Sequence, residues 1–137
     1  MFFRKDNKIK DNNFLTKVCA LLIHAAKIDE NYTDQEEEII KKTLIELGLE
    51  PEKISKTIED AKAIEEKSNQ ILDFTKEVKN LPEENKIKIV ESLWSIIYSN
   101  KDADLYEANL MRRLAGLLYV DNKTMGDIKE KTKKNFK

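Results

Sequence analysis

Glycine and proline are scarce in this chain, with 3 Gly and 2 Pro among 137 residues. Sheet proteins need more turn residues and more β-branched runs, and no segment here alternates between apolar and polar residues at period two. Hydrophobic residues make up 40% of the chain and charged residues 37%, a balance typical of soluble helical proteins. The composition therefore predicts an all-α protein, and the length suits one domain with a core of its own.

Cysteine occurs only once, so an internal disulfide is excluded. The absence of a disulfide framework fits a reducing compartment. Cys19 lies in an apolar run and has no histidine or basic residue at helical spacing that would lower its pKa. We therefore expect Cys19 to be a core residue rather than a nucleophile.

The chain also lacks an excess of charge and a long apolar run. Its net charge is -1, and its basic end, residues 129–137, carries one aromatic residue, so nothing argues for nucleic acid or an anionic membrane as a partner. The longest apolar run, residues 18–26, is too short to span a bilayer. Residues 1–5 lack the apolar core of a signal peptide. We expect a cytoplasmic protein that is not itself transmembrane and binds no nucleic acid.

Apolar residues recur at steps of three and four along most of the chain, which predicts about seven helices. Apart from Phe2, Phe3 and Ile9, residues 1–12 are polar and predicted to be a flexible N-terminal arm, so the helical domain is expected over 13–137. The expected helices are 13–28, 34–47, 51–63, 68–78, 82–99, one starting at 104, and 121–134. The helices at 13–28 and 82–99 are the most apolar, and we place them at the centre with Trp94 buried.

Local signals mark several helix ends. Thr33 to Glu36 form a capping box, in which each side chain can pair with the backbone N–H of the other residue. Gly48 suits the end of the second helix, and Asp121 suits the cap of the last. These signals predict helix starts after Thr33 and Asp121 and a helix end before Gly48.

A helix–acidic turn–helix pattern occurs twice. When the two copies are laid over each other, the matching pairs are Asp29 with Asn100, Asn31 with Asp102, Thr33 with Asp104, and Glu36 with Glu107. The chain is therefore expected to contain two pseudo-symmetric units. If the two central helices pack together, the two turns could lie close to each other.

The two turns supply oxygen ligands of the kind that Ca²⁺, Mg²⁺ and Mn²⁺ prefer. The candidate metal ligands are Asp29, Asn31, Glu36, Asn100, Asp102, Asp104 and Glu107. Neither turn is an EF-hand, because the sixth position holds Asp34 or Leu105 instead of Gly, and the twelfth lacks Glu. Helix capping and turn chemistry explain the same acidic residues without a metal. We prefer that structural explanation, and the metal site stays open as the alternative.

Other polar residues are expected to be structural. His24 is alone on an apolar helix, so we expect packing rather than ligation. Arg112 and Arg113 are expected to form salt bridges with the acidic turns rather than to bind an anion. The chain has no glycine-rich phosphate loop, nucleophile elbow, Cys/His metal spacing or paired catalytic acids.

Several of these features together resemble the TerB-like (tellurite-resistance B) family over roughly residues 15–134. The resemblance rests on Asp29 with a Glu seven residues later, on Leu81-Pro-Glu-Glu, and on the run Glu107-Ala-Asn-Leu-Met-Arg-Arg-Leu-Ala-Gly-Leu-Leu. The family's usual Asp-Gly turn is replaced here by Asp29-Glu30 and by Asn100-Lys101.

The resemblance implies an all-helical fold of about seven helices with a pseudo-twofold pair of acidic turns. It also implies tellurite-type stress resistance, with metal binding or complex assembly at the inner face of the membrane and no established enzymatic activity. We therefore predict a non-catalytic module that binds a partner protein, with a divalent cation at the acidic turns as the open alternative to capping alone. The alternative is a divalent-metal-dependent enzyme that uses those turns, and a purely structural role for the turns is a third interpretation.

Overall fold

The computed structural model describes residues 12–27, 33–67, 72–76, 78–99 and 105–134. All regular structure in these ranges is helical, which confirms the all-α prediction. The α-helices are α1 (Asn12–Ala26), α2 (Asp34–Leu47), α3 (Ile54–Lys67), α4 (Leu72–Thr75), α5 (Glu83–Ser99), α6 (Leu105–Leu117) and α7 (Asn122–Lys134). Two 3-10 turns, η1 (Pro51–Lys53) and η2 (Val78–Asn80), precede α3 and α5. Residues 1–11, most of the predicted arm, lie outside the described ranges.

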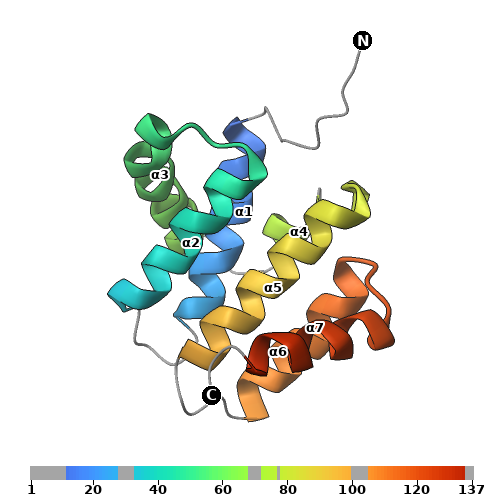
Figure 1. Ribbon diagram of the computed structural model, residues 1–137. Helices are drawn as coiled ribbons and strands as arrows, with labels where there is room; N and C mark the ends of the chain where they lie inside the picture. The colour runs from blue at the N-terminus through green and yellow to red at the C-terminus, as the bar shows by residue number, and fades with distance from the viewer. Residues whose placement is uncertain (1–11, 28–32, 68–71, 77, 100–104, 135–137) are drawn as a thin grey trace.

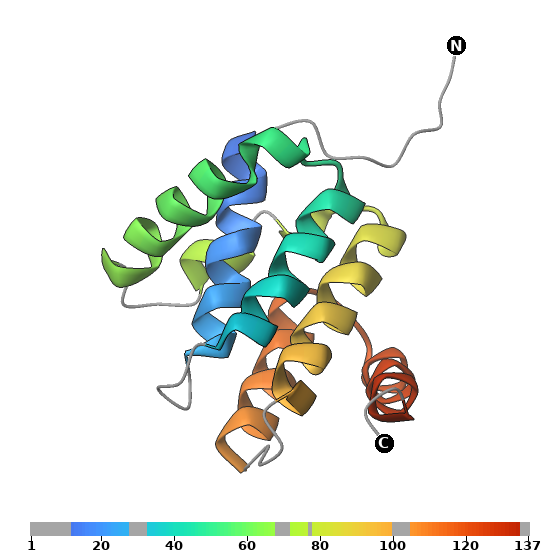
Figure 2. The ribbon, with the colours of Figure 1, turned by 60° about the vertical axis from the view of Figure 1, so that its left-hand side comes forward.

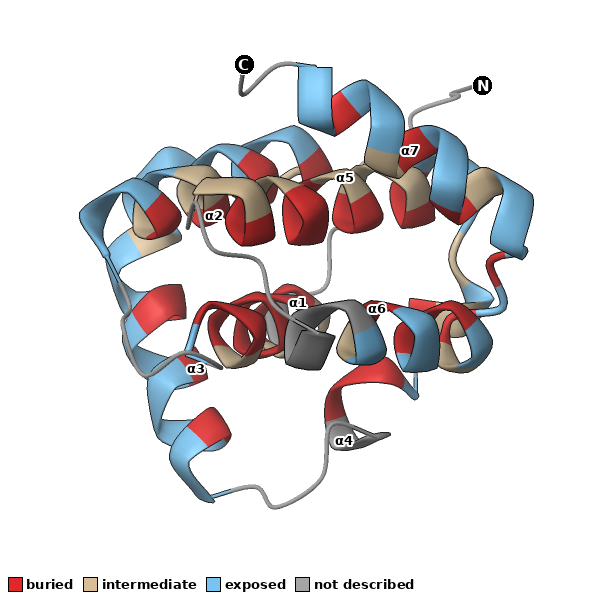
Figure 3. Ribbon diagram, turned by 90° about the horizontal axis from the view of Figure 1, so that it is seen from below, coloured by how far each residue is buried: buried red, intermediate tan, exposed pale blue. Residues whose placement is uncertain are grey.

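Helix α1 is the centre of the molecule, since it packs against α2, α3, α4 and α5 (Figure 1). Seen along another direction, α2 and α5 lie side by side and turn their buried faces toward α1 and α6 (Figure 3). The packing also repeats between the two predicted units. α1 makes its most extensive contacts with α3, and α5 makes its most extensive contacts with α7. This repetition agrees with two pseudo-symmetric units.

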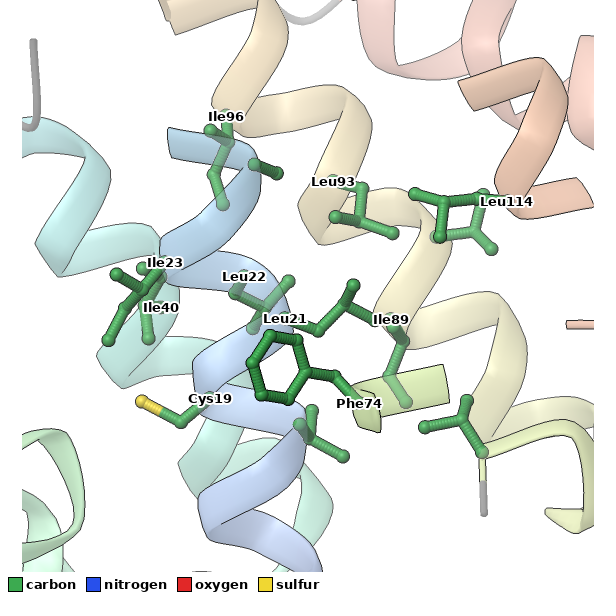
Figure 4. Close-up of a cluster of buried hydrophobic side chains, with 14 of the residues drawn as sticks. Cys19, Leu21, Leu22, Ile23, Ile40, Phe74, Ile89, Leu93, Ile96 and Leu114 are labelled. Carbon is green, nitrogen blue, oxygen red and sulfur yellow. The ribbon is translucent and has the colours of Figure 1, made fainter. Parts of the chain in front are cut away.

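Leucine and isoleucine side chains make up most of the core drawn in Figure 4, and α1 and α5 contribute most of the labelled ones. Because α1 has neighbours on several sides, residues all round it are buried, which explains its wide apolar band. The core side chains labelled in the figure are Cys19, Leu21, Leu22 and Ile23 of α1, Ile40 of α2, Phe74 of α4, Ile89, Leu93 and Ile96 of α5, and Leu114 of α6. The predicted burial of Trp94 in α5 is also confirmed, as 6% of the residue is exposed.

Both predicted ends of α2 are confirmed. Thr33 is the N-cap, and the capping box with Glu36 is complete. After the last turn Gly48 takes the left-handed conformation, with φ 119°, which glycine adopts without steric cost. The N–H of Gly48 donates to the carbonyl of Ile45 at 3.0 Å, and that of Leu49 donates to Leu44 at 2.9 Å. This pair of bonds closes the helix end in the way that a Schellman motif does.

The end of α6 repeats this geometry with a residue that the sequence did not indicate. Tyr119 has φ 58°, and no other non-glycine residue in the described ranges has a positive φ. The N–H of Val120 donates to the carbonyl of Ala115 at 2.9 Å, so the helix end closes as it does at Gly48. Next along the chain, Asp121 accepts a hydrogen bond from the N–H of Thr124 at 2.7 Å. The predicted cap of α7 is thereby confirmed, and this bond lowers the pKa of Asp121.

Two predicted helices differ from the structure. The helix expected at 51–63 starts as a 3-10 turn and continues to Lys67, because Glu65 in its last turn is buried against the end of α1. The helix expected at 68–78 is reduced to the short α4 followed by η2, with Ser68 outside the described residues. Phe74 and Val78 are buried as expected, so the apolar positions were right although the continuous helix was wrong.

Candidate functional site at the acidic turns

Most predicted metal ligands fall in segments outside the described residues. These are Asp29, Asn31, Asn100, Asp102 and Asp104. Glu107 belongs to α6, but its side chain also lies outside the described part. Within the described ranges, no group of three or more His, Cys, Asp or Glu side chains could hold a metal ion. The metal site of the two turns therefore stays a prediction.

Glu36 is the one candidate ligand whose side chain is described, and it caps α2. The residue is 2% exposed. Its Oε1 accepts the backbone N–H of Thr33 at 2.8 Å and the Thr33 hydroxyl at 3.2 Å. In return, the Glu36 N–H donates to Thr33 Oγ1 at 3.1 Å. The structural explanation predicted for Glu36 is confirmed, and one of its carboxylate oxygens is committed to the cap.

A charged cluster that was not predicted from the sequence lies just before the first acidic turn, at the end of α1. It consists of His24, Lys27 and Glu65. The Glu65 carboxylate in α3 accepts from Lys27 Nζ at 2.6 Å through Oε1. Its Oε2 lies 3.2 Å from His24 Nδ1. The Glu65 side chain is 10% exposed, whereas those of His24 and Lys27 are 36% and 41% exposed. These contacts join the last turn of α1 to α3.

The ionisation of Glu65 follows from these neighbours. Burial alone raises the pKa of this carboxyl group, but the hydrogen bonds from Lys27 and His24 outweigh burial and lower it. Glu65 is therefore a stable anion at neutral pH. Both ends of the first acidic turn are thus fixed: Lys27, just before it, is held by Glu65, and Thr33, just after it, is held by Glu36.

His24 is less buried than a core residue, and its Nδ1 contacts Glu65 instead of packing alone. Its ring also lies 6.5 Å from that of Phe74. This contact was not predicted, because Glu65 lay beyond the expected end of the helix at 51–63 and no local pattern set it apart from the other carboxylates of the chain. Sequence spacing cannot pair residues 41 positions apart.

The two arginines of α6 show no ion pair within the described ranges. Arg112 is exposed, and its Nη1 lies 3.4 Å from Asn109 Oδ1. The expected salt bridges to the acidic turns involve residues outside those ranges and stay a prediction. Cys19, in contrast, is confirmed as a core residue, because it is fully buried and burial raises the pKa of its thiol to about 12.

A family model described as Tellurite resistance protein TerB matches residues 15–130. The chain belongs to the TerB family. The match starts in α1, ends in α7 and so includes both helix–turn–helix units of this TerB fold. Neither the curated proteins nor the solved structures contain a match. No helix among the residues described for this TerB protein is long and apolar enough to cross a membrane.

Proposed function

We propose that this TerB protein is a non-catalytic helical module of tellurite-type stress resistance that acts by binding a partner protein. The family match over residues 15–130 carries the proposal. The non-catalytic role is supported by the two buried glutamates. Glu36 accepts a hydrogen bond from Thr33 and Glu65 accepts one from Lys27, so both carboxylates have structural roles. We place the module in the cytoplasm, with its partner at the inner face of the membrane.

A divalent cation at the acidic turns is the second part of the proposal. The donor set fits Ca²⁺, Mg²⁺ or Mn²⁺ by chemistry, since it consists of carboxylate and amide oxygens. Glu36 Oε1 is occupied by the capping box, so the turn residues Asp29 and Asn31 would provide the other ligands of the first turn. Asn100 carries no charge where the first copy has Asp29, so we expect the first turn to hold the ion more tightly.

Partner binding is tested by purifying the tagged chain at its natural level from cells grown with and without tellurite. We expect one partner protein to be recovered in a fixed ratio after extensive washing. The reciprocal purification, with the tag on that partner, should recover this chain. A chain that elutes alone under both growth conditions, with or without membrane extract, would refute the proposal. Hydrolytic activity of the purified chain with added Mn²⁺ or Mg²⁺ would instead support the enzymatic alternative.

Cation binding is tested by thermal melts with chelator, Ca²⁺, Mg²⁺, Mn²⁺ and Zn²⁺. An ion at a hundred times its Kd stabilises the folded state by about 2.7 kcal/mol, which raises the Tm of a chain of this size by roughly 8–10 °C. Glu36→Gln should lose that shift while keeping most of the cap, because Gln also fits this position of a capping box. Glu38→Gln, at an exposed position of the same helix, is the matched control. A wild-type melt that no ion changes at millimolar concentration would leave capping as the sufficient explanation.

A further inference from the structure

A pocket of about 200 Å³ lies where α5, α6 and α7 meet. Figure 2 shows α7 beside α5, at the side of the molecule away from α3. The residues that matter for its chemistry are Trp94 of α5, Met111 and Arg112 of α6, and Met125, Gly126 and Lys129 of α7. This pocket is separate from the acidic turns and was not indicated by the sequence.

The indole of Trp94 lacks the hydrogen bond that a buried tryptophan usually makes. Its Nε1 is buried and has no acceptor among the described residues. The ring stacks on Tyr98 with centroids 5.9 Å apart, so the apolar part of the side chain is well packed. A buried N–H without a partner has lost its hydrogen bond to water and gained none in return, which is unfavourable. A ligand with an acceptor oxygen could recover that free energy.

Gly126 leaves space beside the pocket. It lies in the interior of α7, where glycine is less favourable than alanine. A Cβ atom added at Gly126 would meet nothing within 4 Å, so no close backbone approach requires a glycine there. Gly116 of α6 has the same open surroundings but does not line the pocket. Gly116 therefore provides a matched control for substitutions at Gly126.

The charged side chains that line the pocket are both positive. No Asp or Glu is among the described residues that line it. Arg112 and Lys129 both line it, and neither forms an ion pair with a described residue. Lys129 Nζ lies 5.4 Å from the centroid of the Trp94 ring. Met111 and Met125 supply apolar, adaptable walls. The lining thus combines the Trp94 ring, two cations, the Asn122 amide and two thioether side chains.

We propose that this pocket binds a small organic carboxylate with a short apolar group. The apolar group lies against the two methionines, and the carboxylate accepts from the Trp94 N–H and faces Arg112 and Lys129. The Trp94 nitrogen is buried, so a ligand reaches it only after a neighbouring side chain has moved. We expect Lys129 to move, because its long, flexible side chain lies over the Trp94 ring. The volume is below the usual range for drug-sized ligands, which suits a fragment-sized acid.

The chain contains one tryptophan, so its indole N–H gives a single cross-peak in a proton–nitrogen NMR spectrum. The full-length protein is titrated with sodium phenylacetate at constant ionic strength, and with phenylacetamide as a neutral analogue. We expect a saturable downfield shift of the indole proton with phenylacetate, with a Kd on the order of 1–10 mM. Phenylacetamide should bind at least about five-fold more weakly, because it lacks the charge. Equal binding of the two probes would refute the assignment to an anion.

Variants separate the pocket from general surface binding. Gly126→Leu should fill the space and abolish saturation, whereas Gly116→Leu should bind phenylacetate like the wild type. Lys129→Gln should weaken phenylacetate at least about three-fold and leave phenylacetamide unchanged, which gives a second test if Gly126→Leu fails to fold. The proposal would be overturned if phenylacetate shifted the indole proton of the wild type linearly, without saturation. It would also be overturned if Gly126→Leu showed the same saturable shift as the wild type.

Discussion

Replacing Glu65 with glutamine should destabilise the protein, because this carboxylate joins the end of α1 to α3. The substitution keeps the shape of the side chain and removes its charge from Lys27 Nζ, 2.6 Å away, and from His24 Nδ1, 3.2 Å away. Removing one partner of a fully buried pair costs about 3–5 kcal/mol, and an exposed pair contributes about 0–1 kcal/mol. Glu65 is buried, but Lys27 is 41% exposed and remains solvated. We therefore expect a loss of about 1–2 kcal/mol.

That loss corresponds to a fall in Tm of roughly 3–7 °C for a chain of this size. How the stability difference between wild type and Glu65→Gln depends on pH shows whether the charge is the cause. The folded pKa of Glu65 is lowered, so the unfolded chain takes up the proton first as the pH falls. The carboxylate's contribution is fully present above its ordinary pKa of about 4.3 and is lost as the pH falls through the folded pKa. The difference between wild type and Glu65→Gln should therefore be constant near neutral pH and shrink below about pH 4.

The control is Glu50→Gln, because Glu50 lies 3.9 Å from Lys53 in an exposed pair. It should leave the denaturant midpoint unchanged. A cycle with Lys27→Met and the double variant should give a coupling free energy of about 1 kcal/mol between Lys27 and Glu65. The reasoning fails if Glu65→Gln is no more destabilising than Glu50→Gln. It also fails if the deficit of Glu65→Gln stays the same at pH 3.

Trp94→Ala should cost about 3–5 kcal/mol in a denaturant melt, since the side chain is buried, and a cost below about 1 kcal/mol would contradict its place in the core. The Cys19 thiol, with a pKa of about 12, should resist a disulfide reagent at pH 8 until the protein is unfolded. Rapid labelling of the native protein would show that α1 is less enclosed than described. Thr33→Ala should cost about 1 kcal/mol and Thr33→Ser much less, and equal losses would argue against the hydroxyl as the cap.

Features set by neighbouring residues were the ones that the sequence predicted well. The capping box at Thr33, the helix end at Gly48 and the cap at Asp121 each depend on a few adjacent positions. The burial of Trp94 followed from the apolar periodicity of its helix, because periodicity identifies an inner face. These signals were enough to give the order of the helices in the described ranges, although the fourth is much shorter than expected.

Contacts between distant segments could not be predicted in the same way. Glu65 and Lys27 are 38 positions apart, and no periodicity links them. Tyr119 adopts a left-handed conformation because the end of α6 imposes it, although a glycine would have been the expected residue. For the acidic turns, capping by Glu36 was predictable from local sequence. Cation binding was not, because it depends on how the two turns lie relative to each other.

The unequal surroundings of α1 and α7 have a consequence for how the native protein opens. Proteins open locally in cooperative units, and a unit with fewer buried contacts opens at a lower free energy. α1 is enclosed by four helices, whereas α7 packs chiefly against α5 (Figure 1). Amide hydrogens of α7 can therefore exchange when that one helix detaches, while those in the middle of α1 must wait for global unfolding. Amide exchange is thus expected to be slowest in the middle of α1. It is expected to be faster in α7, which can detach and repack without unfolding of the remaining helices.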